Sequence, residues 1–177
     1  MARAMKLSAA VFFGFTAVFT GLYWGMYDWA MPFAITFATC FYHFAMRLFV
    51  GHLINWLMNN RADYRSAWYT LHPFEKKLYK ALRVKKWKSN VPTYDPSCFD
   101  PKLHSWDEIA QAMCQAEIVH EVIVVLSFVP LLAVIPFGSF WVFAITSLLS
   151  ALYDLSFVII QRFNRPRIIK FIEKERA

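Results

Sequence analysis

The sequence predicts an all-α polytopic membrane protein with four transmembrane helices and a cytoplasmic helix-loop region between the second and the third. Three observations support this fold class. Of the 177 residues, 58% are hydrophobic and 19% aromatic, which is too apolar for a soluble domain of this size. Four apolar runs are each long enough to cross a bilayer. The cations lie beside these runs and form no separate basic domain.

The first two predicted spans cover about residues 7–24 and 31–49. Arg3 and Lys6 precede the first span, and no small-residue cleavage site follows it, so we interpret it as a retained helix and not as a signal peptide. An aromatic cluster at 23–29 suits the water interface between the two spans. His43 and Arg47 lie one helical turn apart near the end of the second span, where we interpret them as interfacial residues.

The region of about 59–115 is the only substantial extramembrane part that the sequence predicts. It is rich in aromatic residues and cations, and three prolines between residues 90 and 102 predict a loop there. Ser105 and Glu108 have the spacing of a capping box, which predicts a helix that begins at Trp106.

The last two predicted spans cover about residues 116–136 and 140–160. Asp154 lies alone among apolar residues of the fourth span. We interpret it first as a partner for a neighbouring span, with a functional acid inside the membrane as the alternative. The two short turns near residues 26–30 and 137–139 carry no Lys or Arg, whereas both termini and the 61–114 region are basic. The positive-inside rule therefore predicts a cell-membrane protein with both termini cytoplasmic.

Charge and cysteine content exclude several classes of function. The formal net charge is +7, but its placement beside apolar spans favours membrane headgroups or an anionic substrate over nucleic acid. Three cysteines, Cys40, Cys98 and Cys114, have no paired spacing, so no disulfide framework is predicted. One histidine and two carboxylates lie within five positions, but no further ligands are evident, and no metal site is predicted.

The predicted topology brings polar residues from distant parts of the chain to one membrane face. Glu117, His120 and Glu121 fall within roughly a 100° arc of one helix face. We predict His120 as a general base and Glu117 as the carboxylate that orients its ring. The predicted substrate-binding residues are Glu75, Lys85, Trp87, Lys88, Glu121, Arg162, Asn164, Arg165 and Arg167. Arginines and an asparagine suit the phosphates or the oxyanion of an acyl donor, so the predicted chemistry is direct acyl transfer to a hydroxyl.

Three blocks of the chain carry a family resemblance. They are residues 73–79 (PFEKKLY) with 82–88 (LRVKKWK), residues 116–120 (AEIVH) and residues 161–167 (QRFNRPR). In this order they resemble the membrane acyltransferase family of the staphyloxanthin pathway, over about residues 68–170. The resemblance implies an O-acyltransferase that acylates the sugar of a glycosylated carotenoid or a related polar lipid. It implies membrane lipids and a lipidic acceptor as partners, no bound cofactor, and acyl-CoA or another acyl donor as cosubstrate. Glu121 stands where the family is expected to have an aromatic residue.

Two other functions compete with acyl transfer at the sequence level. A small membrane methyltransferase also places His, Glu and Arg at a lipid interface, although no S-adenosylmethionine signature is evident. A lipid-binding or accessory subunit without catalysis uses such a polar face to hold a partner. Residues 83–88 also suit a simple collar for lipid headgroups, because juxtamembrane cations commonly serve that purpose.

Overall fold

The computed structural model describes residues 2–176, and the described part consists of helices and connections without a strand. Its long helices are α1 (Ala2–Trp24), α2 (Met31–Met58), α5 (Trp106–Leu126) and α7 (Phe140–Arg176). Four helical stretches are long and apolar enough to cross a membrane: α1, α2 with the preceding turn, α5 with its continuation to Phe137, and α7. The predicted all-α fold with four membrane helices is therefore confirmed.

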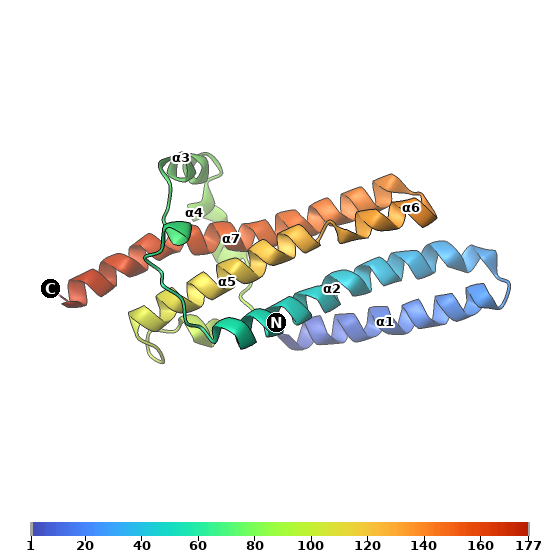
Figure 1. The fold of residues 1–177 in the computed structure, drawn as a ribbon, viewed down its shortest axis with the longest axis horizontal. Coiled ribbons are helices and arrows are strands. Elements are labelled where there is room, and N and C mark those ends of the chain that lie inside the picture. The colour runs from blue at the N-terminus through green and yellow to red at the C-terminus, as the bar shows by residue number, and fades with distance from the viewer. Residues whose placement is uncertain (1, 177) are drawn as a thin grey trace.

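The long helices form two hairpins whose turns lie at the same end of the molecule (Figure 1). In the first, α1 and α2 join through the short 3-10 helix η1 (Asp28–Ala30), and phenylalanines interleave along their contact. The ring centroids of Phe12 and Phe44 are 5.5 Å apart and those of Phe19 and Phe33 are 5.2 Å apart. Such stacked pairs add to the apolar contact between helices.

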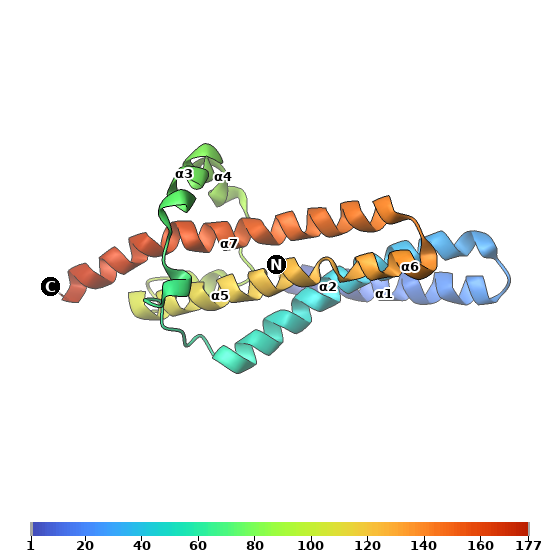
Figure 2. The same cartoon turned by 45° about the horizontal axis from the view of Figure 1, so that its top comes forward.

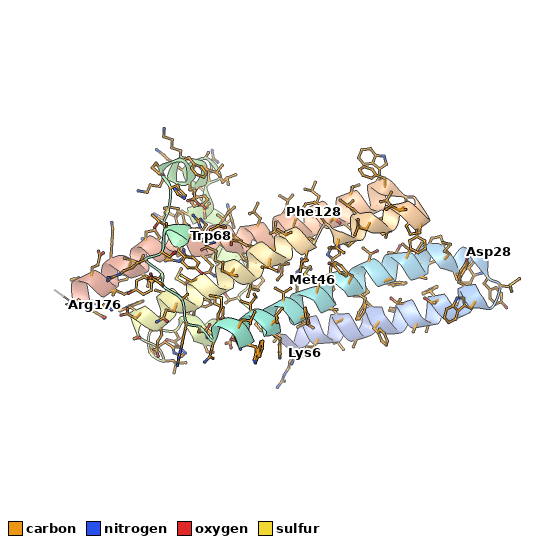
Figure 3. All side chains as sticks on the ribbon, in the orientation of Figure 1. Lys6, Asp28, Met46, Trp68, Phe128 and Arg176 are labelled. Carbon is orange, nitrogen blue, oxygen red and sulfur yellow. The ribbon has the colours of Figure 1, made fainter. Side chains whose placement is uncertain are left out.

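The second hairpin packs α5 against α7, and α2 packs against α5 to join the two hairpins. Met46 and Val50 of α2 are buried against Ile123 of α5. Figure 3 shows Asp28 at the end with the turns and Arg176 at the opposite end. The arrangement places all residues between α2 and α5 at the end away from the turns (Figure 2).

The third membrane stretch is broken, although the sequence predicts it as continuous. After α5 the chain forms the 3-10 helix η5 (Val129–Ala133) and the short helix α6 (Val134–Phe137). Pro130 has no N–H to donate to the carbonyl of Leu126, four residues earlier. The Tyr42 hydroxyl donates to that carbonyl instead, at 2.8 Å. A side chain from α2 thus satisfies the backbone group that the proline leaves open, as the low-dielectric membrane requires.

We name residues 59–105, which connect α2 and α5, the cap. The cap contains η2 (Ala67–Tyr69), α3 (Pro73–Ala81), α4 (Val84–Trp87), η3 (Lys88–Asn90) and η4 (Pro96–Phe99). Its α3 and α4 lie to one side of α7 in both views (Figures 1 and 2). The predicted capping box at its end is confirmed: the Ser105 backbone N–H donates to Glu108 at 2.8 Å and Ser105 Oγ accepts from the Glu108 N–H at 3.3 Å.

Two helices extend beyond the apolar runs from which they were predicted. The second continues to Met58 and the fourth to Arg176, because residues beyond both runs keep the helical backbone. Asn59, with a φ of 46°, ends α2 in the left-handed conformation that asparagine tolerates better than most residues.

Candidate functional site

A cavity of about 410 Å³ lies among α2, α5, α7 and the cap. Its lining mixes apolar and polar side chains. The apolar ones include Leu48, Ile123, Phe157 and Ile160. The polar ones include Asn55, Lys88, Thr93, Asp95, Gln115, His120, Asp154 and Gln161. An amphipathic molecule with an apolar tail and a polar head matches such a mixed lining.

His120 is one of two histidines that line this cavity, and two neighbours fix its ring. Its Nδ1 lies 2.9 Å from Oδ1 of Asp154 on α7. Its imidazole stacks on the Phe157 ring with centroids 4.4 Å apart and planes within 7°. An ionised carboxylate only accepts hydrogen bonds, so Nδ1 is the donor in this contact, and Nε2 is not engaged by it.

Asp154 is 1% exposed and is paired with a buried cation. Its Oδ2 accepts from Nε of Arg47 at 3.0 Å and from Nη2 of Arg47 at 2.5 Å. The guanidinium compensates the charge that burial would otherwise penalise. Asp154 is therefore held from both sides, by α2 through Arg47 and by α5 through His120.

The polar contacts continue from Arg47 towards the turns. Arg47 Nη2 also donates to Ser150 Oγ at 2.8 Å, and Ser150 Oγ lies 3.0 Å from Nδ1 of His43. Ser127 Oγ, 2.9 Å from Ser150 Oγ, links α5 to the same network. We call His43, Arg47, His120, Ser150 and Asp154 the histidine centre. It joins three helices inside the bundle.

The histidine centre corrects two interpretations from the sequence and extends a third. Glu117 is not the carboxylate that orients His120, because both of its oxygens accept from arginines while Asp154 pairs with the ring. His43 and Arg47 are not interfacial, since His43 is 7% exposed and the Arg47 side chain 13%. Asp154 does join neighbouring helices, as the preferred interpretation stated, but it also lines the cavity beside His120.

A second polar cluster fastens the cap to the bundle. Arg162 of α7 makes five hydrogen bonds. Its Nε and Nη2 donate to Glu75 at 2.6 and 2.9 Å, and its Nη1 donates to Glu117 at 2.6 Å. Nη1 also donates to the Trp68 carbonyl, and Nη2 also donates to the Thr70 carbonyl. A guanidinium has five N–H donors, so none remains for a substrate. The structure therefore gives Arg162 contacts to the cap and to Glu117, and its predicted role in substrate binding stays a prediction.

Arg165 and Glu117 complete this cluster. Arg165 donates to the second oxygen of Glu117 and, at 2.9 Å, to the carbonyl of Tyr69. Arg165 is 1% exposed and Glu117 is fully buried, so neither reaches a ligand from the cavity or from solvent. We call Glu75, Glu117, Arg162 and Arg165 the arginine clamp. The charges of its two acids balance those of its two arginines. In this structure Glu75 and Arg165 hold the cap to the bundle and do not line the cavity.

The other predicted binding residues lie in different surroundings. Lys88 lines the cavity, and its Nζ donates to Asn164 at 2.5 Å. Glu121 accepts from the Trp68 indole N–H at 3.1 Å, and Figure 3 shows Trp68 beside α5 and α7. Trp87 donates to the Leu82 carbonyl. Lys85 and Arg167 are exposed. Of the nine residues predicted to bind substrate, Lys88 alone is among those that line this cavity.

The pKa of Glu75 gives a test of the arginine clamp. Burial alone would raise the pKa of this carboxyl, but hydrogen bonds from Arg162, from the His72 N–H and from Tyr79 outweigh burial and hold the pKa at about 2. Because the folded pKa lies below the unfolded value, Glu75 stabilises the fold above about pH 4.5, and this stability is lost as pH falls towards 2. It amounts to roughly 3 kcal/mol.

We therefore expect the difference in unfolding temperature between wild type and Glu75→Gln to be constant from pH 6 to 8 and to shrink below about pH 4.5. Thermal unfolding in detergent across this pH range measures it. Glu173→Gln is the control, because Glu173 is exposed. A difference that stays constant down to pH 3 would show that Arg162 does not stabilise the Glu75 carboxylate.

The fold and the site define a small four-helix membrane protein with a histidine and carboxylate pair in a cavity beneath an extramembrane cap. Within residues 2–176 no group of three or more His, Cys, Asp or Glu side chains is placed to hold a metal ion. The family model of glycosyl-4,4'-diaponeurosporenoate acyltransferase matches residues 65–174, and the chain belongs to this family. It is an acyltransferase. Comparisons with curated proteins and with solved structures give no match.

The matched range includes His120 and Asp154 but not Arg47. One feature of the sequence could have predicted that Asp154 pairs with Arg47. An acid inside a membrane span requires a compensating partner, and Arg47 is the cation in the second predicted span. Pairing the two would have placed α2 beside α7.

Proposed function

We propose that this protein transfers a fatty acyl group to a hydroxyl of a glycolipid, a glycosylated isoprenoid or a related polar lipid, with His120 as the general base. One observation carries the proposal: the ring of His120 lines an amphipathic cavity and is oriented by the buried carboxylate of Asp154. The family name, which includes a glycosylated acceptor, supports the same acceptor class.

His120 acts through Nε2, because Nδ1 is engaged with Asp154. As an acceptor hydroxyl attacks the acyl carbonyl, Nε2 takes its proton. Asp154 keeps the proton of the ring on Nδ1 and stabilises the imidazolium that forms. Arg47 positions Asp154, since two of its nitrogens bind the same carboxylate oxygen.

The step transfers the acyl group without an acyl-enzyme intermediate. For a thioester donor such as acyl-CoA, the new bond joins the acceptor oxygen to the acyl carbon, and the carbon–sulfur bond breaks. The proton passes from the hydroxyl to Nε2 and then to the departing thiolate. Lys88 lies in the wall of the cavity, where an ammonium group can stabilise the oxyanion of the tetrahedral intermediate.

The lining of the cavity suits both parts of such an acceptor. Its apolar side chains, among them Leu48, Ile123 and Phe157, suit an isoprenoid or acyl chain. Its hydrogen-bonding side chains, among them Asn55 and Thr93, suit a sugar. His120 belongs to the same lining.

The charge distribution supports a cell-membrane location with the cap and both termini cytoplasmic. The two hairpin turns share one end of the molecule and contain no Lys or Arg (Figure 1). The cap, at the other end, is basic. The positive-inside rule assigns the basic end to the cytoplasm, where acyl-CoA is made.

Acyl transfer is tested with the purified protein in nanodiscs, using radiolabelled acyl-CoA and a panel of acceptors: a glycosylated C30 carotenoid acid, a diglucosyl diacylglycerol and an unglycosylated carotenoid acid. We expect an ester product with at least one glycosylated acceptor and none with the unglycosylated one. A labelled product with the unglycosylated acid, or none with any acceptor and any acyl chain length, would contradict the proposal. Acid-stable incorporation of label from S-adenosylmethionine would instead support a methyltransferase.

A further inference from the structure

One face of α3 exposes an apolar stripe that the rest of the chain leaves uncovered. Phe74 is 66% exposed, Leu78 46% and Leu82, just after the helix, 45%. At about 100° per residue these three side chains lie at roughly 0°, 40° and 80° around the helix axis. They therefore form one continuous stripe, and the chain offers nothing in the described residues that covers it.

The other side of the same segment is strongly basic. Six exposed cations lie on and just after α3: Lys76, Lys77, Lys80, Arg83, Lys85 and Lys86. The one acid of α3, Glu75, points into the bundle and is bound to Arg162, so it does not neutralise this surface. An apolar stripe beside a cationic face is the pattern of a helix that lies in the plane of a membrane surface.

The position of α3 brings this pattern to the membrane surface. Glu75 and Tyr79 hold the helix to α7, Glu75 through Arg162 and Tyr79 through contact with the Phe163 ring. Figures 1 and 2 show α3 and α4 projecting from one side of α7, outside the bundle. From this attachment α7 continues towards the turns with exposed leucines, which face the lipid of the membrane it crosses.

We propose that α3 and α4 lie in the headgroup layer of the same bilayer. Phe74, Leu78 and Leu82 insert at the boundary with the acyl chains, and the six cations bind anionic phospholipid headgroups. The bilayer is the occupant because the stripe projects from a helix that itself crosses the membrane. The residues at issue lie outside the cavity of the histidine centre, so this proposal does not depend on acyl transfer.

The test measures the depth of single side chains. Cys40, Cys98 and Cys114 are replaced by alanine, and a nitroxide is attached to a new cysteine in one of two matched pairs of α3 variants: Leu78→Cys with Lys80→Cys, and Phe74→Cys with Lys76→Cys. The proteins are reconstituted in phosphatidylglycerol nanodiscs. Relaxation by oxygen, which concentrates in the bilayer, is compared with relaxation by a water-soluble nickel chelate.

We expect the ratio of oxygen to nickel relaxation to be several-fold higher at positions 74 and 78 than at 76 and 80. Phosphatidylcholine nanodiscs should reduce this contrast, because they remove the anionic headgroups. The two pairs report independently, so a poorly folded variant of one leaves the other informative. Equal nickel accessibility at 78 and 80, and at 74 and 76, would overturn the proposal and indicate that the stripe is a surface for a water-soluble protein. An equal difference in the oxygen-to-nickel ratio in both lipids would contradict the proposed binding of the six cations to anionic headgroups.

Discussion

Replacing His120 with Gln is expected to lower kcat for acyl transfer by roughly 10²- to 10⁴-fold, the usual contribution of a positioned general base. Glutamine has nearly the same reach but no lone pair that can take a proton near neutral pH. Asp154 keeps its pairing with Arg47 in this variant, so the fold should persist. The rate is measured with saturating acyl donor and acceptor in nanodiscs, alongside the unfolding temperature.

One further variant tests the orientation of the His120 ring, and one control variant lies outside the histidine centre. Asp154→Asn should also lower kcat strongly, because an amide can donate to Nδ1 and turn the ring to the wrong tautomer. His72→Gln is the matched control, since His72 is exposed on the cap and lies outside the cavity. Full turnover by a folded His120→Gln protein would remove this residue from the mechanism.

Replacing Glu117 with Gln is expected to destabilise the protein by about 3–5 kcal/mol, the usual cost of breaking a buried ion pair from one side. The substitution leaves the Arg165 guanidinium, 1% exposed, without the carboxylate it donates to. Arg162 keeps Glu75, so the loss falls on Arg165. For a chain of this length the unfolding temperature should fall by about 10 °C.

Glu121→Gln is the matched control for this effect. Glu121 lies one turn further along α5, is partly exposed and accepts one hydrogen bond from the Trp68 indole. A glutamine can still accept that bond, so we expect a change below about 1 kcal/mol. Thermal unfolding of both variants in the same detergent makes the comparison. Equal unfolding temperatures for the two variants would show that the buried ion pair of Glu117 adds no stability beyond that of the Glu121 contact.

The helices could be predicted largely from apolar run length, because a membrane span must satisfy its own backbone hydrogen bonds. The break in the helix after α5 could not be predicted in this way. Pro130 is visible in the sequence, but whether a proline bends or ends a membrane helix depends on what satisfies the carbonyl it leaves open. Here that group is the hydroxyl of Tyr42, on another helix. Its position requires the packing of α2 against α5.

The candidate site was predictable in part. His120 stood out because an ionisable residue at the start of an apolar span needs a polar neighbour. Its partner could not be chosen from the sequence, because Glu117 lies one helical turn away and Asp154 is 34 positions distant. Both residues face α7, where Glu117 contacts Arg162 and Arg165 and His120 contacts Asp154. The arginines of residues 161–167 looked like an anion site because the sequence does not show that Glu75 reaches them.

The last helix supplies the missing partner to every buried charge described above. Asp154, Arg162 and Arg165 all belong to α7, whereas Glu75, Glu117, Arg47 and His120 are made earlier. During synthesis these earlier groups therefore lack their partners until α7 has been made. The arrangement of buried charges described above can form only after this final helix has left the ribosome.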